Sequence, residues 1–189
     1  LHVLHISTKD EIELFDAGPI ENKKITSEVC IPHLLFSSSD YENLGSLIKC
    51  NPSIKANSDK TALRQALKKG VIDYVATDHA PHILSEKEKN YLNSPSGMPS
   101  VQHSFLAVLE MVHDGDLEIT DVPKITSHNV AKRFEIKDRG FINEGFWADL
   151  VLVNMNDSYE VKKEKIFYKC GWSPFESYTF KSRIVETII

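Results

Sequence analysis

The amino-acid sequence predicts an α/β fold in which parallel strands alternate with helices. Short apolar runs typical of buried strands alternate with stretches of helical composition. Four successive runs also end in a polar residue that can bind a metal ion or a substrate. Because the chemistry of parallel α/β barrels gathers at the carboxyl ends of the strands, the pattern indicates an enzyme site built from strand ends.

The four predicted strands lie in the early part of the chain. In sequence order they are residues 1–6, 29–33, 47–50 and 71–75, and the polar residues at their ends are His5, His33, Asn51 and Asp78. A charged or imidazole side chain at the end of a buried strand is costly unless it finds a partner. Any one of these residues alone is explained as a turn former or a hydrogen-bonded core residue. Their joint occurrence at successive strand ends favours a shared site.

Helices are predicted between these strands. Residues 9–17 form the first, with Thr8 as its N-cap and Glu11 at the capping-box position. Residues 59–69 form the next, and Gly70 lies where a glycine commonly ends a helix.

The second half of the chain is predicted to contain a loop, two helices and further strands. Residues 83–97 are polar, and a loop of this length in a compact domain is commonly functional. Apolar spacing predicts helices over residues 99–112 and 125–134. Strands of a small β-domain are expected over residues 145–155 and 181–189.

Composition and charge narrow the functional classes. The chain of 189 residues is 41% hydrophobic and 26% charged, which is typical of globular proteins. A net charge of −5 without a basic stripe disfavours a nucleic-acid partner. No apolar run reaches membrane-spanning length. The three cysteines, Cys30, Cys50 and Cys170, lack zinc-finger spacing and are expected to be reduced thiols of a cytoplasmic protein.

The most specific motif follows the fourth predicted strand. Asp78-His79-Ala80-Pro81-His82 places a carboxylate and two imidazoles within five residues. These groups are suitable zinc ligands, which indicates a metal-dependent hydrolase. Preceded by Ala76 and Thr77, the motif resembles that of dihydroorotases in the amidohydrolase superfamily.

Other segments resemble dihydroorotase motifs in the family's order along nearly the whole chain. They are residues 5–8, 29–33, 50–55, 127–132, 145–151 and 173–176. The chain departs from the family's pattern at Ile31, at Leu34 and at residues 53–55, which leaves the subtype within the family open.

The resemblance implies the C-terminal half of a TIM-like (β/α)8 metal-dependent hydrolase barrel plus part of a small β-domain. Residues 1–135 correspond to strands five to eight of the barrel with the helices after them, and residues 136–189 to the β-domain segment. The family's H-x-H metal pair and its carboxylated lysine belong to earlier strands and have no counterpart in this sequence. Since a full barrel needs about 250 residues, we expect a longer polypeptide to supply them.

For the reaction, the resemblance implies reversible zinc-dependent interconversion of L-dihydroorotate and N-carbamoyl-L-aspartate in pyrimidine biosynthesis. One or two zinc ions are expected, with His5 and His33 on one metal and Asp78 on the other. Asp78 would also carry a proton from the attacking water to the departing amide nitrogen. The positions that resemble substrate-binding residues are Asn51, His82 and Gly97.

Two other functions stay open at this stage. Dihydropyrimidinase, hydantoinase or allantoinase activity would use the same scaffold, although Asn51 and the Ala80–His82 ending favour dihydroorotase. A non-catalytic homologue that scaffolds aspartate transcarbamoylase would lose metal ligands, whereas the ligand types are retained. The expected partners are the small-molecule substrate and either a second copy of the protein or aspartate transcarbamoylase. The isolated chain is expected to be inactive.

Overall fold

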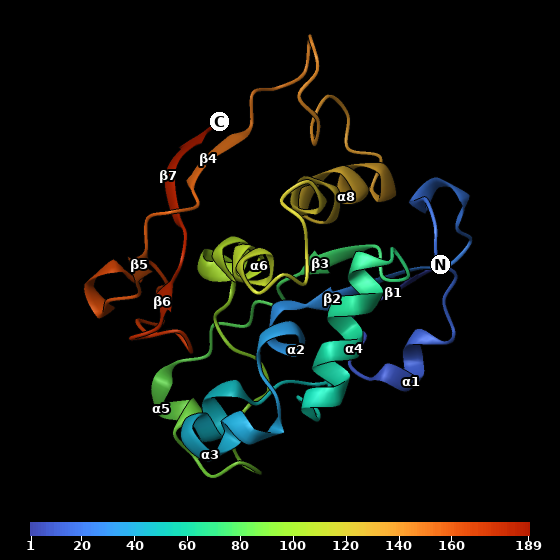
Figure 1. The fold of residues 1–189 in the computed structure, drawn as a ribbon. Coiled ribbons are helices and arrows are strands. Elements are labelled where there is room, and N and C mark those ends of the chain that lie inside the picture. The colour runs from blue at the N-terminus through green and yellow to red at the C-terminus, as the bar shows by residue number, and fades with distance from the viewer.

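The computed structural model describes residues 1–189 and is built around a three-stranded parallel sheet with helices packed on it (Figure 1). The middle strand pairs in parallel with both of its neighbours. In sheet order the strands are β1 (His2–Val3), β2 (Thr26–Cys30) and β3 (Tyr74–Ala76). The sheet confirms the predicted parallel α/β arrangement.

The chain contains eight α-helices. They are α1 (Lys9–Ile12), α2 (Ile31–Leu35), α3 (Tyr41–Leu44), α4 (Asn57–Lys68), α5 (Leu84–Lys87), α6 (Ser104–His113), α7 (Asp121–Pro123) and α8 (Asn129–Arg133). A π-helical turn, Lys124–His128, joins α7 to α8, which together replace the single helix expected over residues 125–134. None of the helices combines the length and the apolar composition needed to cross a membrane.

Local chemistry sets the start of α1 and the end of α4 close to the predicted places. The Thr8 hydroxyl accepts a hydrogen bond from the Glu11 N–H, and the Glu11 carboxylate accepts one from the Thr8 N–H at 2.8 Å. Gly70 follows α4 in the left-handed region, with φ +66°. α1 ends at Ile12, earlier than predicted, because it buries no residue and packing supplies most of the stability of a helix in a protein.

Two predicted strands were wrong in position or kind. β2 begins earlier than predicted and ends at Cys30, so that His33 lies in α2, whose first turn accommodates Pro32. Residues 47–50 form no strand, because a 3₁₀ turn, Gly45–Ile48, leads into them. Their apolar side chains are buried instead in a small cluster of Ile48, Cys50, Ile54, Met98 and Trp172.

The C-terminal segment forms two antiparallel strand pairs, of which the first lies within the ranges expected and the second was not predicted. β4 (Leu150–Asn154) pairs with β7 (Arg183–Ile188), and β5 (Tyr159–Glu160) pairs with β6 (Thr179–Phe180). In Figure 1 these pairs lie on the opposite side of the molecule from the N-terminus.

One hydrophobic cluster of 19 buried residues joins the sheet, the helices and the C-terminal segment. It includes Val29 of β2, Leu63 of α4 and Met111 of α6. Phe175 and Phe180, from the C-terminal segment, belong to the same cluster. The tail therefore packs directly against the half of the molecule that carries the strand ends.

Candidate active site

The predicted metal ligands lie on the segments that follow the three parallel strands. His5 follows β1, His33 follows β2 within α2, and Asp78 follows β3. His5 and Asp78 both adopt left-handed backbone conformations, with φ 40° and 47°. Such angles are uncommon outside glycine and turn the chain sharply, often at functional sites. Because the strands run in parallel, all three residues lie at the same edge of the sheet.

The charges of these side chains act on one another. Burial lowers the pKa of His33, whereas a hydrogen bond to the Pro52 carbonyl and the Asp78 carboxylate raise it. The His5 ring adds to the lowering. Since electrostatic effects of this kind weaken rapidly with distance, the three residues belong to one region.

The His33 ring has one nitrogen in a hydrogen bond and the other without a partner. Its Nε2 lies 2.9 Å from the Pro52 carbonyl oxygen, which only accepts, so Nε2 carries the proton. Nδ1 of the neutral ring is therefore an acceptor, and it is buried without a partner. Metal-binding histidines commonly donate their other N–H to a backbone carbonyl in this way, which fixes the ring.

The donor chemistry fits zinc, but the chain does not enclose an ion. No three His, Cys, Asp or Glu side chains converge closely enough to hold one. His5, His33 and Asp78 supply the imidazole and carboxylate groups that zinc binds. The unpartnered Nδ1 of His33 is the atom that a metal would satisfy.

Two buried thiols lie beneath the same region. Burial raises the pKa of Cys50 to about 12, and the Asp78 charge adds to this effect. Burial, with the charges of Glu28 and Asp78, also raises the pKa of Cys30. Both cysteines are free and stay protonated at neutral pH, which favours a packing role over a thiolate ligand.

His82, predicted to bind substrate, is held by neighbours on both sides. Its Nε2 lies 3.0 Å from the Ser96 carbonyl oxygen, and its Nδ1 lies 3.7 Å from the Glu86 carboxylate. The indole N–H of Trp172 donates to the His82 carbonyl at 2.8 Å. The loop after α5 and the C-terminal tail therefore meet at this histidine.

Gly97 lies directly against the Asp78–His82 loop. A Cβ on Gly97 would stand 2.4 Å from the Cβ of Ala80, and its φ of +107° is one that other residues rarely adopt. Its N–H donates to the Lys49 carbonyl at 2.8 Å. A residue without a side chain is therefore needed for this close approach.

Asn51 directly precedes Pro52, the residue that contacts the His33 ring. It is exposed, and a cis peptide bond joins it to Pro52, whose carbonyl accepts the His33 hydrogen bond. The structure thus brings His5, His33 and Asp78 to one edge of the sheet and links Asn51 to His33 through Pro52, while His82 and Gly97 lie on adjoining loops.

Sequence reasoning missed three residues that hold these loops together: Lys87, Tyr168 and Trp172. The Tyr168 ring lies 5.3 Å from the His79 ring between centroids, and its hydroxyl accepts the Gln102 N–H. A cleft of about 560 Å³ lies there, lined by His79, Pro81, Ile83 and residues 167–170. A lysine in a polar loop and aromatic residues in a tail give no sequence signal for such contacts.

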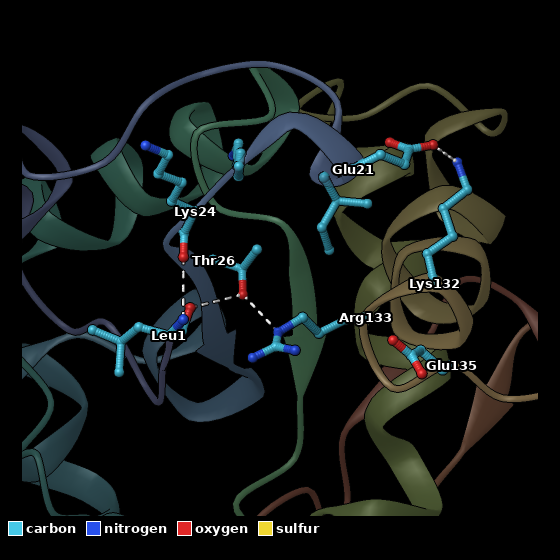
Figure 2. Close-up of a pocket in the computed structure, with 9 residues that line it drawn as sticks. Leu1, Glu21, Lys24, Thr26, Lys132, Arg133 and Glu135 are labelled. Carbon is cyan, nitrogen blue, oxygen red and sulfur yellow. Dashed lines mark hydrogen bonds and ion pairs between the residues drawn. The ribbon is translucent and has the colours of Figure 1, made fainter.

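A separate hollow of about 280 Å³ lies at the amino ends of β1 and β2 (Figure 2). Two of its basic side chains have partners within the chain. Lys132 pairs with Glu21, and Arg133 donates to the Thr26 hydroxyl at 2.9 Å. Since both side chains have partners within the chain, the hollow is a weaker candidate than the strand ends.

Comparisons with known proteins find relatives over the whole chain. A model of the amidohydrolase family matches residues 2–181. A dihydroorotase from Endomicrobium trichonymphae is 34% identical, covering 100% of this chain and 45% of its own length. A dihydroorotase from Halobacterium salinarum is 35% identical, covering 94% and 41%. An allantoinase from Bacillus velezensis is 34% identical, covering 99% and 41%. The chain thus spans less than half the length of these relatives.

Solved structures share the fold. An L-hydantoinase from Arthrobacter aurescens superposes with a TM-score of 0.90 at 24% identity, covering 100% of this chain and 43% of its own. A D-hydantoinase from Thermus sp. gives 0.88 at 23% identity, with the same coverage. These likenesses confirm the predicted fold class, part of a TIM-like hydrolase barrel with a β-domain segment.

Proposed function

Because this chain belongs to the amidohydrolase family, we propose that it is the part of a dihydroorotase that carries the acid–base carboxylate and the substrate-binding loops. The reaction opens the ring of L-dihydroorotate to N-carbamoyl-L-aspartate, or closes it in reverse. The observation that supports this most directly is that His5, His33 and Asp78 lie at one edge of the sheet. The Nδ1 atom of His33 is buried there without a partner.

His5, His33 and Asp78 would hold one or two zinc ions together with groups from outside this chain. When bound, zinc lowers the pKa of a water molecule and polarises the amide carbonyl. His33 is prepared for this role because its Nε2–H is fixed on the Pro52 carbonyl and its Nδ1 is free. Its lowered pKa keeps the ring neutral, as a ligand must be, at neutral pH.

Asp78 is the group that moves the proton in this proposal. It is exposed at the end of β3, where its carboxylate can reach a water molecule and a bound ring. It takes a proton from the attacking water and passes it to the departing amide nitrogen. The left-handed backbone at Asp78 turns the chain sharply at the end of β3.

Asn51 and His82 bind the substrate in this proposal. The Asn51 amide offers a donor and an acceptor to the ring amide. His82 would donate a ring N–H to the substrate carboxylate from the place where its ring meets the Ser96 carbonyl. Gly97 would act through its backbone, which packs against Ala80 and sets the shape of the loop that the ring approaches.

A second candidate is a different cyclic amidohydrolase. The allantoinase from Bacillus velezensis is as similar in sequence as the Endomicrobium dihydroorotase, at 34% identity. Both reactions break a cyclic amide bond, and His5, His33 and Asp78 would have the same roles in both, whereas Asn51 and His82 favour dihydroorotase. Only the substrate distinguishes the two proposals.

The test uses the full-length protein, with bound zinc quantified and ring opening measured on L-dihydroorotate, allantoin and hydantoin. We expect zinc and turnover of L-dihydroorotate, and a fall in kcat of at least about 100-fold in Asp78→Asn. Asn keeps the shape of Asp and tolerates a left-handed backbone. Asp138→Asn is the matched control, because Asp138 also has a positive φ, 56°, but lies after α8.

Other outcomes reassign the protein. Zinc with turnover of allantoin or hydantoin alone would identify a different cyclic amidohydrolase. Absence of both zinc and turnover would favour a scaffolding homologue. Equal turnover in Asp78→Asn and Asp138→Asn would show that the Asp78 carboxylate does not transfer the proton in the reaction.

A further inference from the structure

Lys87, the last residue of α5, is completely buried, with 0% of its surface exposed. A lysine is almost never buried to this degree without a paired carboxylate. The partners of its ammonium are instead three backbone carbonyl oxygens. They belong to Pro95 at 2.8 Å, Gly97 at 2.6 Å and Lys49 at 3.4 Å.

The number of partners matches the chemistry of an ammonium group. Lysine has three N–H donors, and the three carbonyls can accept all of them. Burial lowers the pKa of Lys87 to about 8, so most of the lysine stays charged at neutral pH. A buried charge is costly, and the carbonyl dipoles are the groups that offset the cost.

These carbonyls belong to the segment that contacts the candidate substrate-binding loop. The Gly97 N–H bonds the Lys49 carbonyl, and Gly97 lies against Ala80. The carbonyl of Ser96, between the two residues that Lys87 binds, meets the His82 ring at 3.0 Å. One ammonium group therefore ties together the segments that carry Asn51, Gly97 and the contact to His82.

We propose that Lys87 is a positioning residue: its ammonium holds residues 95–97 so that Gly97 rests on Ala80 and the Ser96 carbonyl meets His82. This sets the shape of the substrate-binding loop without contact between Lys87 and the substrate. The consequence for substrate binding rests on the proposed function, whereas the ordering of the loop does not.

Two other roles for this lysine conflict with its surroundings. A carboxylated lysine would place carbamate oxygens against the carbonyls of Pro95 and Gly97, where acceptor would meet acceptor. A solvated surface charge is excluded because the side chain is fully buried.

The experiment compares Lys87→Met with Lys89→Met in the full-length protein. Methionine fills similar volume without donors, and Lys89, two residues away, is exposed. With L-dihydroorotate as substrate, we expect KM to rise about tenfold in Lys87→Met while kcat changes less than about twofold. Amide hydrogen exchange should accelerate over residues 79–82 and 94–98 only. Lys89→Met should match the wild type.

A milder variant covers the case in which Lys87→Met does not fold. The Ser46 hydroxyl donates to the Lys87 carbonyl, so Ser46→Ala loosens the end of α5 and leaves the ammonium in place. We expect smaller changes in the same direction. Unchanged KM and unchanged exchange over residues 94–98, with or without a loss of thermal stability, would overturn the proposal. If the wild type does not act on L-dihydroorotate, the proposed function fails, while hydrogen exchange still decides the role of Lys87.

Discussion

Positive φ angles distinguish three of the candidate site residues, His5, Asp78 and Gly97. For His5 and Asp78 the positive φ turns the chain sharply just after a strand. For Gly97 it brings the backbone against Ala80. Glycine is the residue that combines this angle with the absence of a Cβ, so Gly97 is the most sensitive of the three to a small substitution.

Gly97→Ala is expected to raise KM about tenfold or more, because a Cβ would meet that of Ala80 at 2.4 Å and force the loops apart. The control is Gly115→Ala, which has a similar φ, +82°, but nothing within 4 Å of an added Cβ. Backbone strain is common to both variants, so a KM increase in Gly97→Ala alone assigns the effect to the contact. Steady-state kinetics on the full-length protein measures it, and equal KM values would contradict the expectation.

At the scale of elements, His103 joins the start of α6 to the C-terminal tail. Its ring is 1% exposed and lies near Phe175 and Phe180. Nδ1 lies 3.2 Å from the Ser173 hydroxyl oxygen, and Nε2 is buried without a partner. Burial lowers the pKa of His103 to about 4, so the folded protein keeps this ring neutral.

This contact predicts a pH dependence of stability. Above pH 6.5 the His103 ring is neutral in both the folded and the unfolded chain, so its titration does not change the free energy of unfolding. Between pH 6.5 and about 4, His103 binds a proton in the unfolded chain but not in the folded chain. The free energy of unfolding should therefore fall as the pH falls, by roughly 2–3 kcal/mol from this residue.

Denaturant unfolding of the full-length protein and of His103→Phe across this range measures the effect. Phe keeps the aromatic packing and removes the titration, so the stability difference between the two proteins should change with pH. Parallel profiles would show that His103 does not titrate as its burial indicates.

At the scale of the whole molecule, the parallel sheet has open edges at β1 and β3. Each offers unpaired backbone groups, and Leu1 and Leu4 near β1 are 78% and 54% exposed. Such edges favour association with other strands. The relatives are more than twice as long, and the three candidate ligands do not enclose a metal ion.

We therefore expect the 189-residue chain, produced alone, to show no turnover of L-dihydroorotate and to associate. Size-exclusion chromatography and the ring-opening assay, with the full-length protein as control, test this. A monomeric chain that turns over substrate would show that it carries a complete site.

Local signals in the sequence were sufficient for the alternation of strands and helices, for the Thr8–Glu11 capping box and for the turn at Gly70. They also located His5 and Asp78 after parallel strands, because strand ends and helix caps depend on neighbouring residues.

Contacts between distant segments decided the rest. Residues 47–50 carry a strand-like pattern, yet packing with Met98 and Trp172 satisfies their apolar side chains without a sheet. The burial of Lys87, the contact of Trp172 with His82 and the unpartnered nitrogen of His33 likewise arise only when remote parts of the chain meet. The sequence shows which groups each side chain can bind. Its burial and its actual partners depend on the whole folded chain.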